Sequence, residues 1–243
     1  MKLFTLCLLV LMACAVIGAV GSVPAYAVDG VVLINQNIAT NGLPGCGAGF
    51  PIFICQPGSY RLSGNLVVSA DTDGIDIGAN DVTLDLNGFT ISGPGTCSGT
   101  PPQIFCSGST GYGINLFFGT NVVIRNGIVR NFQIGIFIAE LRTSFNSGVI
   151  SSVEEITAYH NTGGISVTNA LVRRNNASFN GGIGISASHS TVLENVANGN
   201  EFSGLSILYG VYGSNTFDGN SFAVGNTGGV SQGNNSCGTG SPC

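Results

Sequence analysis

Gly164-Ile165-Ser166 recurs as Gly184-Ile185-Ser186 and again as Gly204-Leu205-Ser206. Two columns of asparagine keep the same interval, namely Asn175, Asn195 and Asn215, and Asn180, Asn200 and Asn220. A fixed period of about 20 residues indicates a chain that is built from stacked structural repeats. We expect the asparagine amides of successive repeats to lie above one another and to hydrogen-bond along the stack.

The Gly-Ile pair also occurs earlier in the chain, at Gly74-Ile75, Gly113-Ile114 and Gly135-Ile136. Two intervals are longer than the regular ones, namely Gly74 to Gly113 and Gly135 to Gly164. The first interval contains Cys97 and Cys106, and the second contains Leu141–Ser147. Each of these intervals therefore predicts an insertion at a turn.

Apolar and polar residues alternate within a repeat, which is typical of β-strands. Val82, Leu84 and Leu86 point to one side of such a strand, and Thr83 and Asp85 point to the other. Three short strands and their turns in about 20 residues suit one coil of a parallel β-helix, whereas propeller blades need about 40 residues. The sequence therefore predicts an all-β solenoid, a parallel β-helix with coils of about 20 residues and ends tied by disulfides.

Two segments, Gln56–Leu66 and Asn80–Ile91, resemble secreted bacterial right-handed parallel β-helix proteins of the pectate-lyase-like superfamily. The resemblance extends from about Val31 to Asn226 and implies a right-handed coil. That superfamily contains polysaccharide lyases, hydrolases, esterases and epimerases, and also adhesins. The resemblance therefore implies the fold without assigning an activity.

The expected organisation is a signal peptide over 1–27 and a single β-helix domain over 28–243. The domain divides into an N-terminal cap over 28–66, coils over 67–221 and a C-terminal end over 222–243. Caps are expected because an open coil exposes an apolar cross-section and a strand edge.

The first residues have the pattern of a signal peptide, with a positive charge at Lys2, an apolar run and a small-x-small site that ends at Ala27. We expect cleavage after Ala27 and a secreted, periplasmic or cell-surface protein. Two alternatives stay open. The apolar run is close to the length of a membrane span, and the residues before Cys14 resemble a lipidation site.

Six cysteines remain after cleavage, and their spacing suggests the local pairs Cys46/Cys55, Cys97/Cys106 and Cys237/Cys243. Each pair encloses a short loop rich in Gly, Pro, Ser or Thr, which can bend enough for a disulfide. A zinc site is the alternative, but no cysteine pair has C-x-x-C spacing. Disulfides fit a protein that is exported to an oxidising compartment.

The composition argues against nucleic acid as a partner. The net charge is −5, only 8% of residues are charged, and Lys2 is the only lysine. No basic patch is therefore available for nucleic acid. We expect a monomer without a membrane span after cleavage, and a polysaccharide or a cell-surface component as the partner.

Catalytic members of the superfamily carry their chemistry on an outward strand face. The outward positions after each repeat glycine hold one carboxylate and no cation: Asp76, Asn115, Phe137, Ser166, Ser186 and Ser206. The motifs of pectate lyases, polygalacturonases and alginate epimerases are absent. Asp73 and Asp76 are candidate carboxylates for glycoside hydrolysis.

Asp71, Asp73 and Asp76 are also candidate calcium ligands, since Ca²⁺ binds six to eight oxygens. The favoured alternative is that Asp71 and Asp73 shape the turn around Gly74 and that Asp76 faces water. No cofactor is expected.

An alternating column of charges emerges when the repeats are aligned on their asparagines: Asp85, Arg125, Glu155, Arg174 and Glu194. We interpret it as an exposed ion ladder that specifies the coil register. The catalytic alternative uses Arg125 or Arg174 between carboxylates. Three phenylalanines on the apolar alternation are predicted to lie in the core: Phe117, Phe179 and Phe217.

The function predicted from these patterns is a non-catalytic extracellular binding protein with a carbohydrate-like ligand. The alternative is a polysaccharide lyase or glycoside hydrolase. A groove in which arginine and carboxylate side chains converge would favour the enzyme, and a surface of Ser, Asn and Thr would favour the binding protein.

Overall fold

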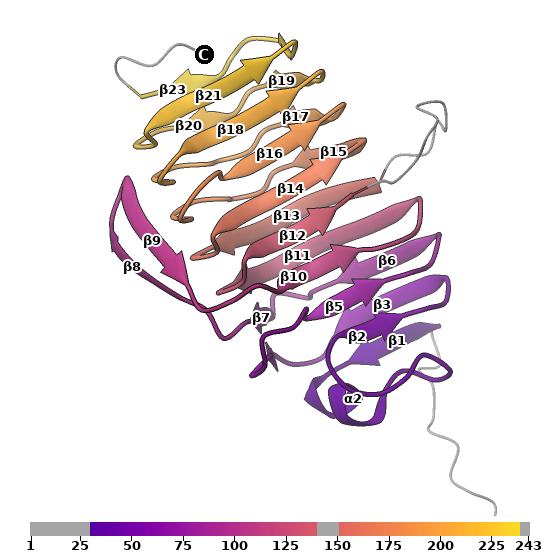
Figure 1. Ribbon diagram of the computed structural model, residues 1–243. Coiled ribbons are helices and arrows are strands. Elements are labelled where there is room, and N and C mark those ends of the chain that lie inside the picture. The colour runs from indigo at the N-terminus through magenta and orange to yellow at the C-terminus, as the bar shows by residue number, and fades with distance from the viewer. Residues whose placement is uncertain (1–29, 140–150, 239–243) are drawn as a thin grey trace, which may run out of the picture.

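The computed structural model describes residues 30–139 and 151–238, and two long parallel sheets dominate it (Figure 1). Sheet B has eight strands, which lie side by side in chain order. They are β2 (Ile52–Ile54), β5 (Ile75–Ile77), β10 (Tyr112–Leu116), β12 (Ile134–Ile138), β14 (Gly163–Thr168), β16 (Ile185–Ser188), β18 (Ser203–Leu208) and β21 (Phe222–Thr227).

Sheet A has eleven strands, and its main path is also in chain order. That path contains β1 (Val31–Ile34), β3 (Gly58–Leu62), β6 (Val82–Asp85), β11 (Val122–Arg130), β13 (Ser151–Tyr159), β15 (Ala170–Arg173), β17 (Thr191–Leu193), β19 (Val211–Gly213) and β22 (Val230–Ser231). Two short strands, β4 (Leu66–Val67) and β7 (Thr90–Ser92), pair with each other, and β7 also pairs with β11. The chain alternates between the two sheets, and we call each passage from one strand of sheet B to the next a round.

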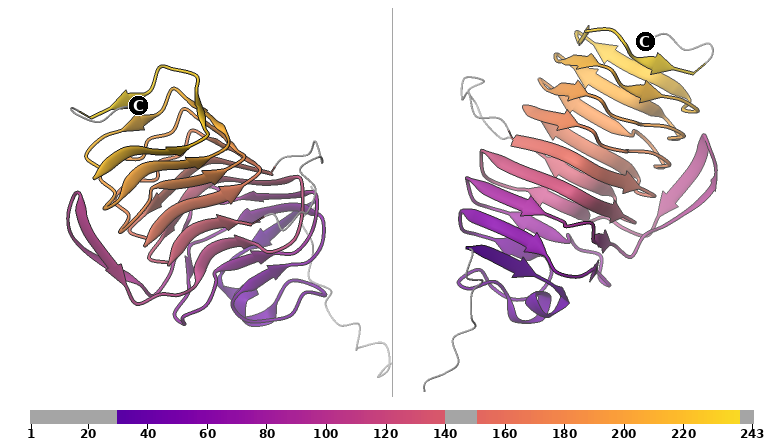
Figure 2. Two further views of the ribbon diagram at one scale, coloured as in Figure 1. Left: turned by 45° about the horizontal axis from the view of Figure 1, so that its top comes forward. Right: turned by 180° about the vertical axis from the view of Figure 1, so that it is seen from behind.

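The strand register follows the repeat found in the sequence. Ile165 is paired with Ile185 and Ile185 with Leu205, and the serines that follow them are paired in the same way. The apolar residue after each repeat glycine is at most 1% exposed, from Ile75 to Leu205. These residues lie between the sheets, where successive rounds bury one continuous apolar core. Figure 2 shows the two sheets facing each other along the whole stack.

The stacked asparagines are buried and hydrogen-bonded to one another. Asn175 donates from Nδ2 to Oδ1 of Asn195 at 3.0 Å, and Asn195 donates to Oδ1 of Asn215 at 3.0 Å. Asn180 and Asn200 form the same contact at 3.0 Å in the second column. The remaining amide protons reach backbone carbonyls of the preceding round, so buried polar groups are satisfied at the turns.

The first predicted insertion is an antiparallel hairpin of β8 (Thr96–Thr100) and β9 (Gln103–Ser107), closed by the Cys97–Cys106 disulfide. It leaves the stack at a turn and runs beside later rounds (Figure 1). A Cβ atom on Gly181 would lie 3.0 Å from Sγ of Cys106, and one on Gly199 would lie 3.1 Å from Cβ of Pro101. The hairpin therefore packs closely against rounds that follow it. The second predicted insertion lies outside the described residues.

The N-terminal end carries the short helix α2 (Gln36–Asn41), which buries Ala39 against the core, and the Cys46–Cys55 disulfide. At the other end β20 (Thr216–Phe217) pairs with β23 (Ser236–Cys237). Two predicted disulfides are thus confirmed, whereas Cys243 lies outside the described residues, as do the predicted signal peptide and Cys14. In the ranges that the structure covers, no helix is long and apolar enough to cross a bilayer.

Two of the three phenylalanines predicted in the core are not there. Phe217 is 1% exposed, but Phe117 is 54% and Phe179 is 44% exposed. Phe117 follows the last residue of β10, and Phe179 has a φ of +57° within a turn. The alternation of a strand does not continue through a turn, which explains the wrong prediction for both residues.

Candidate ligand-binding groove

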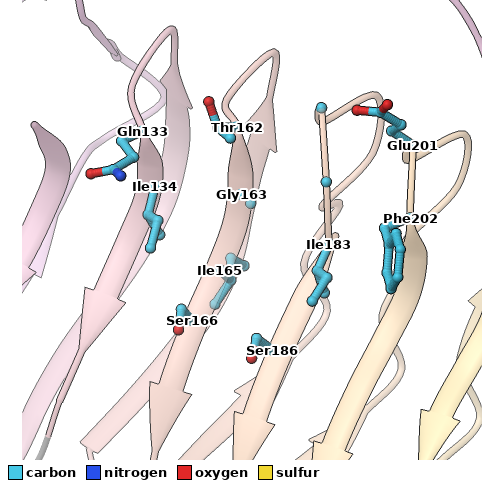
Figure 3. Close-up of a pocket in the computed structure, with 13 residues that line it drawn as sticks. Gln133, Ile134, Thr162, Gly163, Ile165, Ser166, Ile183, Ser186, Glu201 and Phe202 are labelled. Carbon is cyan, nitrogen blue, oxygen red and sulfur yellow. The ribbon is translucent and has the colours of Figure 1, made fainter. Parts of the chain in front are cut away.

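A cavity of about 550 Å³ opens on the outer face of sheet B (Figure 3). We call it the groove. It crosses β12 and β14 and the segments before β16 and β18, so it spans three strand spacings or about 14 Å. Its lining consists of Gln133, Ile134, Thr162, Gly163, Gly164, Ile165, Ser166, Gly181, Gly182, Ile183, Ser186, Glu201 and Phe202.

Small outward side chains form the floor of the groove. Gly163 is paired with Ile134 on the neighbouring strand, and Ser166 is paired with Ser186. The lack of a side chain at Gly163 and the short side chains at both serines leave the strands close to the surface. Phe202 rises at one end of this floor and is 57% exposed.

The lining combines an aromatic ring with hydrogen-bonding groups. Thr162, Ser166 and Ser186 carry hydroxyl groups, Gln133 carries an amide, and Glu201 carries the one carboxylate of the lining. The ring of Phe202 lies 5.6 Å from that of Phe222 on β21, measured between centroids. Pockets with apolar walls and a few polar groups are typical of small-molecule and cofactor sites.

The same face of sheet B continues toward the N-terminal end. Phe137 on β12 stacks on Tyr112 of β10 with 4.7 Å between ring centroids. Phe137 is paired with Asn115, and Asn115 with Asp76 of β5. Asp76 therefore lies in the same outward column as Ser166, three strands away.

Asp73 and Asp76, which the sequence nominated together, are neighbours in the structure. Asp73 accepts hydrogen bonds from the backbone N–H of Tyr112 at 2.7 Å and from Nδ2 of Asn115 at 3.0 Å. Oδ1 of Asp76 is buried and has no hydrogen-bond partner. Desolvation raises the pKa of Asp76 to about 7, with further contributions from the charge and hydrogen bond of Asp73, against a lowering contribution from Asn115. Asp76, which the sequence analysis expected to face water, therefore keeps its proton to near neutral pH.

Asp71 has a different environment. Its carboxylate accepts hydrogen bonds from the backbone N–H of Thr110 at 2.6 Å and from the Thr110 hydroxyl at 3.0 Å. These bonds hold the pKa of Asp71 below its usual value. Asp71 and Asp73 thus join the round before the hairpin to the chain segment after it. Across residues 30–139 and 151–238, no group of three or more His, Cys, Asp and Glu side chains is placed to hold a metal ion.

The pH dependence of stability can test whether the pKa of Asp76 is raised in the folded protein. The folded state keeps the Asp76 proton to about pH 7, whereas the unfolded carboxyl loses it near 3.8. The unfolding free energy should therefore fall as the pH rises from about 4 to 8. Asp76→Asn stays neutral, so we expect it to be more stable than the wild type by about 1–2 kcal/mol at about pH 8, after allowance for partial solvation of the carboxylate. The two proteins should be equally stable at about pH 4.

Urea denaturation at both pH values measures this effect. Asp81→Asn is the matched control, because that carboxylate is exposed and lies outside the pair. Equal stability of Asp76→Asn and the wild type at high pH would show that water solvates the ionised Asp76 fully in the folded protein.

The other nominated residues, Arg125 and Arg174, lie away from these carboxylates. Arg125 is on β11 of sheet A and contacts Asp85 at 3.3 Å. Arg174 follows β15 of the same sheet and contacts Glu194 at 2.9 Å and Glu155 at 3.7 Å. The structure therefore brings Asp73 and Asp76 together but leaves both arginines on the other sheet.

The prediction of a single charge column is wrong, because the register after Arg125 differs by one residue from the predicted one. Asp85 and Arg125 are paired as predicted, but Arg125 is then paired with Glu154, and Glu154 with Arg173. Glu154 and Arg173 form an ion pair at 2.8 Å. The predicted members Glu155, Arg174 and Glu194 form a second column beside the first, at positions where the backbone is left-handed, with φ between 55° and 59°.

The error comes from two roles of asparagine. Asn131 has a φ of +64° and occupies the left-handed turn position of its round, as His160 does in the next. Asn161 lies one residue later, and its Oδ1 accepts a hydrogen bond from the backbone N–H of Phe132. Alignment of Asn131 with Asn161 therefore shifted the register by one residue.

Sequence reasoning did not identify Glu201 and Phe202. A signal was present, since Gly182, Phe202 and Phe222 follow one another at the repeat interval. The change from glycine at position 182 to exposed phenylalanine rings at positions 202 and 222 marks the end of the groove where its wall stands above the floor.

The chain matches no protein-family model, no curated protein and no solved structure. Its function is therefore inferred from the groove.

Proposed function

We propose that this chain is a secreted right-handed parallel β-helix protein that binds a carbohydrate in the groove without catalysing its cleavage. The alternation of the chain between two facing parallel sheets supports the β-helix, as do the rows of hydrogen-bonded asparagines, which we interpret as asparagine ladders. The two disulfides indicate an oxidising compartment, in agreement with export.

The composition of the groove carries the proposal. A sugar presents hydroxyl groups at its edges and C–H groups on its faces, so it needs hydrogen-bonding side chains beside an aromatic ring. The groove offers this combination through Ser166, Ser186, Gln133 and Thr162 along its length, with the exposed ring of Phe202 at one end. The floor is formed by paired strands, so these groups are held in place before a ligand arrives.

Affinity electrophoresis and titration calorimetry with a panel of soluble polysaccharides test the proposal. Phe202→Ala removes the ring, and Gly163→Val adds a side chain to the floor. A Cβ atom on Gly163 would have no neighbour closer than 3.6 Å, so the fold should tolerate the change. Each substitution should weaken binding by about tenfold or more.

Phe117→Ala is the matched control, because Phe117 is similarly exposed at 54% but lies outside the groove. It should bind as the wild type does. If no polysaccharide binds, or if all three variants bind like the wild type, the groove is not a carbohydrate site.

A glycoside hydrolase is the second candidate, because Asp76 holds a proton to near neutral pH, as a general acid must. Asp73 is the neighbouring carboxyl group, and glycosidases use two such groups. A screen for reducing sugars and unsaturated products tests this function. Activity that Asp76→Asn abolishes would favour the enzyme over the binding protein.

A further inference from the structure

The two sheets differ in charge. In the described part of the chain every arginine belongs to sheet A or to the turn that follows β15: Arg61, Arg125, Arg130, Arg173 and Arg174. Four ion pairs there involve Arg125, Arg173 and Arg174, and Arg130 lies 6.0 Å from the ring of Tyr159. Arg125, Arg130, Arg173 and Arg174 are thus already engaged with partners on their own side of the stack.

The charged side chains that the described residues place on the outer face of sheet B are carboxylates. Glu201 lies in the groove, and Asp73 and Asp76 lie further along the same face. The backbone of Glu201 is held on both sides, since its N–H donates to the carbonyl of Asn180 and its carbonyl accepts from Ser221. Among the described residues no cation forms an ion pair with Glu201.

This distribution bears on the charge of the ligand. An anionic glycan would meet a carboxylate in the groove and no arginine or lysine on the described face, and like charges repel. A glycan with a free amine would instead place an ammonium group beside Glu201. The ring of Phe202 next to it attracts a cation through its π face.

We infer that the groove selects against polyuronates and sulfated glycans and prefers a glycan that carries free amino groups, with Glu201 as the residue that sets this preference. The inference rests on the proposed function.

Two matched pairs of probes test it by titration calorimetry, with the full secreted chain. One pair is homogalacturonan with and without methyl esters, and the other is a set of glucosamine oligomers with and without N-acetyl groups. In each pair the less negative or more positive member should bind more tightly, by about threefold to tenfold at low ionic strength. Added salt should reduce the difference, because an exposed charge is screened.

Glu201→Gln should remove the preference for free amines, so that the ratio of the affinities for the glucosamine oligomers with and without N-acetyl groups falls to about one. Glu194→Gln is the matched control, since Glu194 pairs with Arg174 on the other side of the stack. Tighter binding of the de-esterified galacturonan would overturn the inference and leave the proposed function intact. If none of the four probes and no neutral polysaccharide binds, the inference and the proposed function fail together.

Discussion

Replacement of Asn195 by alanine is expected to lower the free energy of unfolding by about 3–5 kcal/mol. The Asn195 carboxamide is 1% exposed and accepts hydrogen bonds from the backbone and side-chain N–H groups of Asn175 at 2.9 and 3.0 Å. It donates to the carbonyls of Val172 and Leu193 and to Oδ1 of Asn215. Alanine leaves several buried groups without partners, and each costs about 1–3 kcal/mol before the structure relaxes.

Urea denaturation of Asn195→Ala and Asn235→Ala compares the loss of unfolding free energy at an interior asparagine of the column with the loss at its last asparagine. Asn235 accepts the same two hydrogen bonds from Asn215, but its own amide bonds only to the exposed Ser231. We expect a loss of about 1–2 kcal/mol for Asn235→Ala. Equal losses for both variants would show that burial inside the column adds nothing to these hydrogen bonds.

The second large effect is expected for Gly164→Ala. A Cβ atom at this position would overlap the carbonyl oxygen of Gly184 and would lie 2.9 Å from Nδ2 of Asn180 and 3.2 Å from Cβ of Ala177. The first two belong to hydrogen-bonded backbone and to a buried amide, so neither can move cheaply. We expect a loss of about 3 kcal/mol or more, because overpacking of a core typically costs about 1–3 kcal/mol and more where backbone must shift.

The preceding residue supplies the control for this substitution. Gly163 lies on the same strand with its missing side chain directed outward, and a Cβ atom there would be 3.6 Å from Cγ1 of Ile134. Gly163→Ala should change stability by less than about 0.5 kcal/mol. A comparable loss at both positions would mean that the backbone of β14, and not the space between rounds, makes glycine necessary.

The fold was predictable to the extent that the repeat is regular. Recurrence of Gly-Ile-Ser at a fixed interval predicted the pairing of Ser166, Ser186 and Ser206, because parallel strands in register place identical residues side by side. Turn positions were less predictable. Asparagine is suited both to the left-handed conformation of Asn131 and to the stacked amide of Asn161, and the sequence alone does not distinguish these uses.

The candidate site was predictable only in part. Asp73 and Asp76 were nominated because they flank a repeat glycine, yet the raised pKa of Asp76 depends on desolvation, which only packing determines. The groove was not predicted. Its depth comes from the height of Phe202 relative to the floor at Gly163, which lies on another strand. Phe179 was wrongly predicted to lie in the core, because a residue in a turn can point either way.

The disulfide-closed hairpin has a consequence for how the molecule loses structure. In a stack of rounds that contact only their neighbours, unfolding can proceed by fraying from either end, one round after another. The hairpin begins before β10 and contacts Gly181 and Gly199, so it connects several rounds that are not neighbours in the sequence. The rounds that contact the hairpin cannot unfold without also losing these contacts. The middle of the stack is therefore coupled into one cooperative unit, while rounds beyond Gly199 are left to open independently.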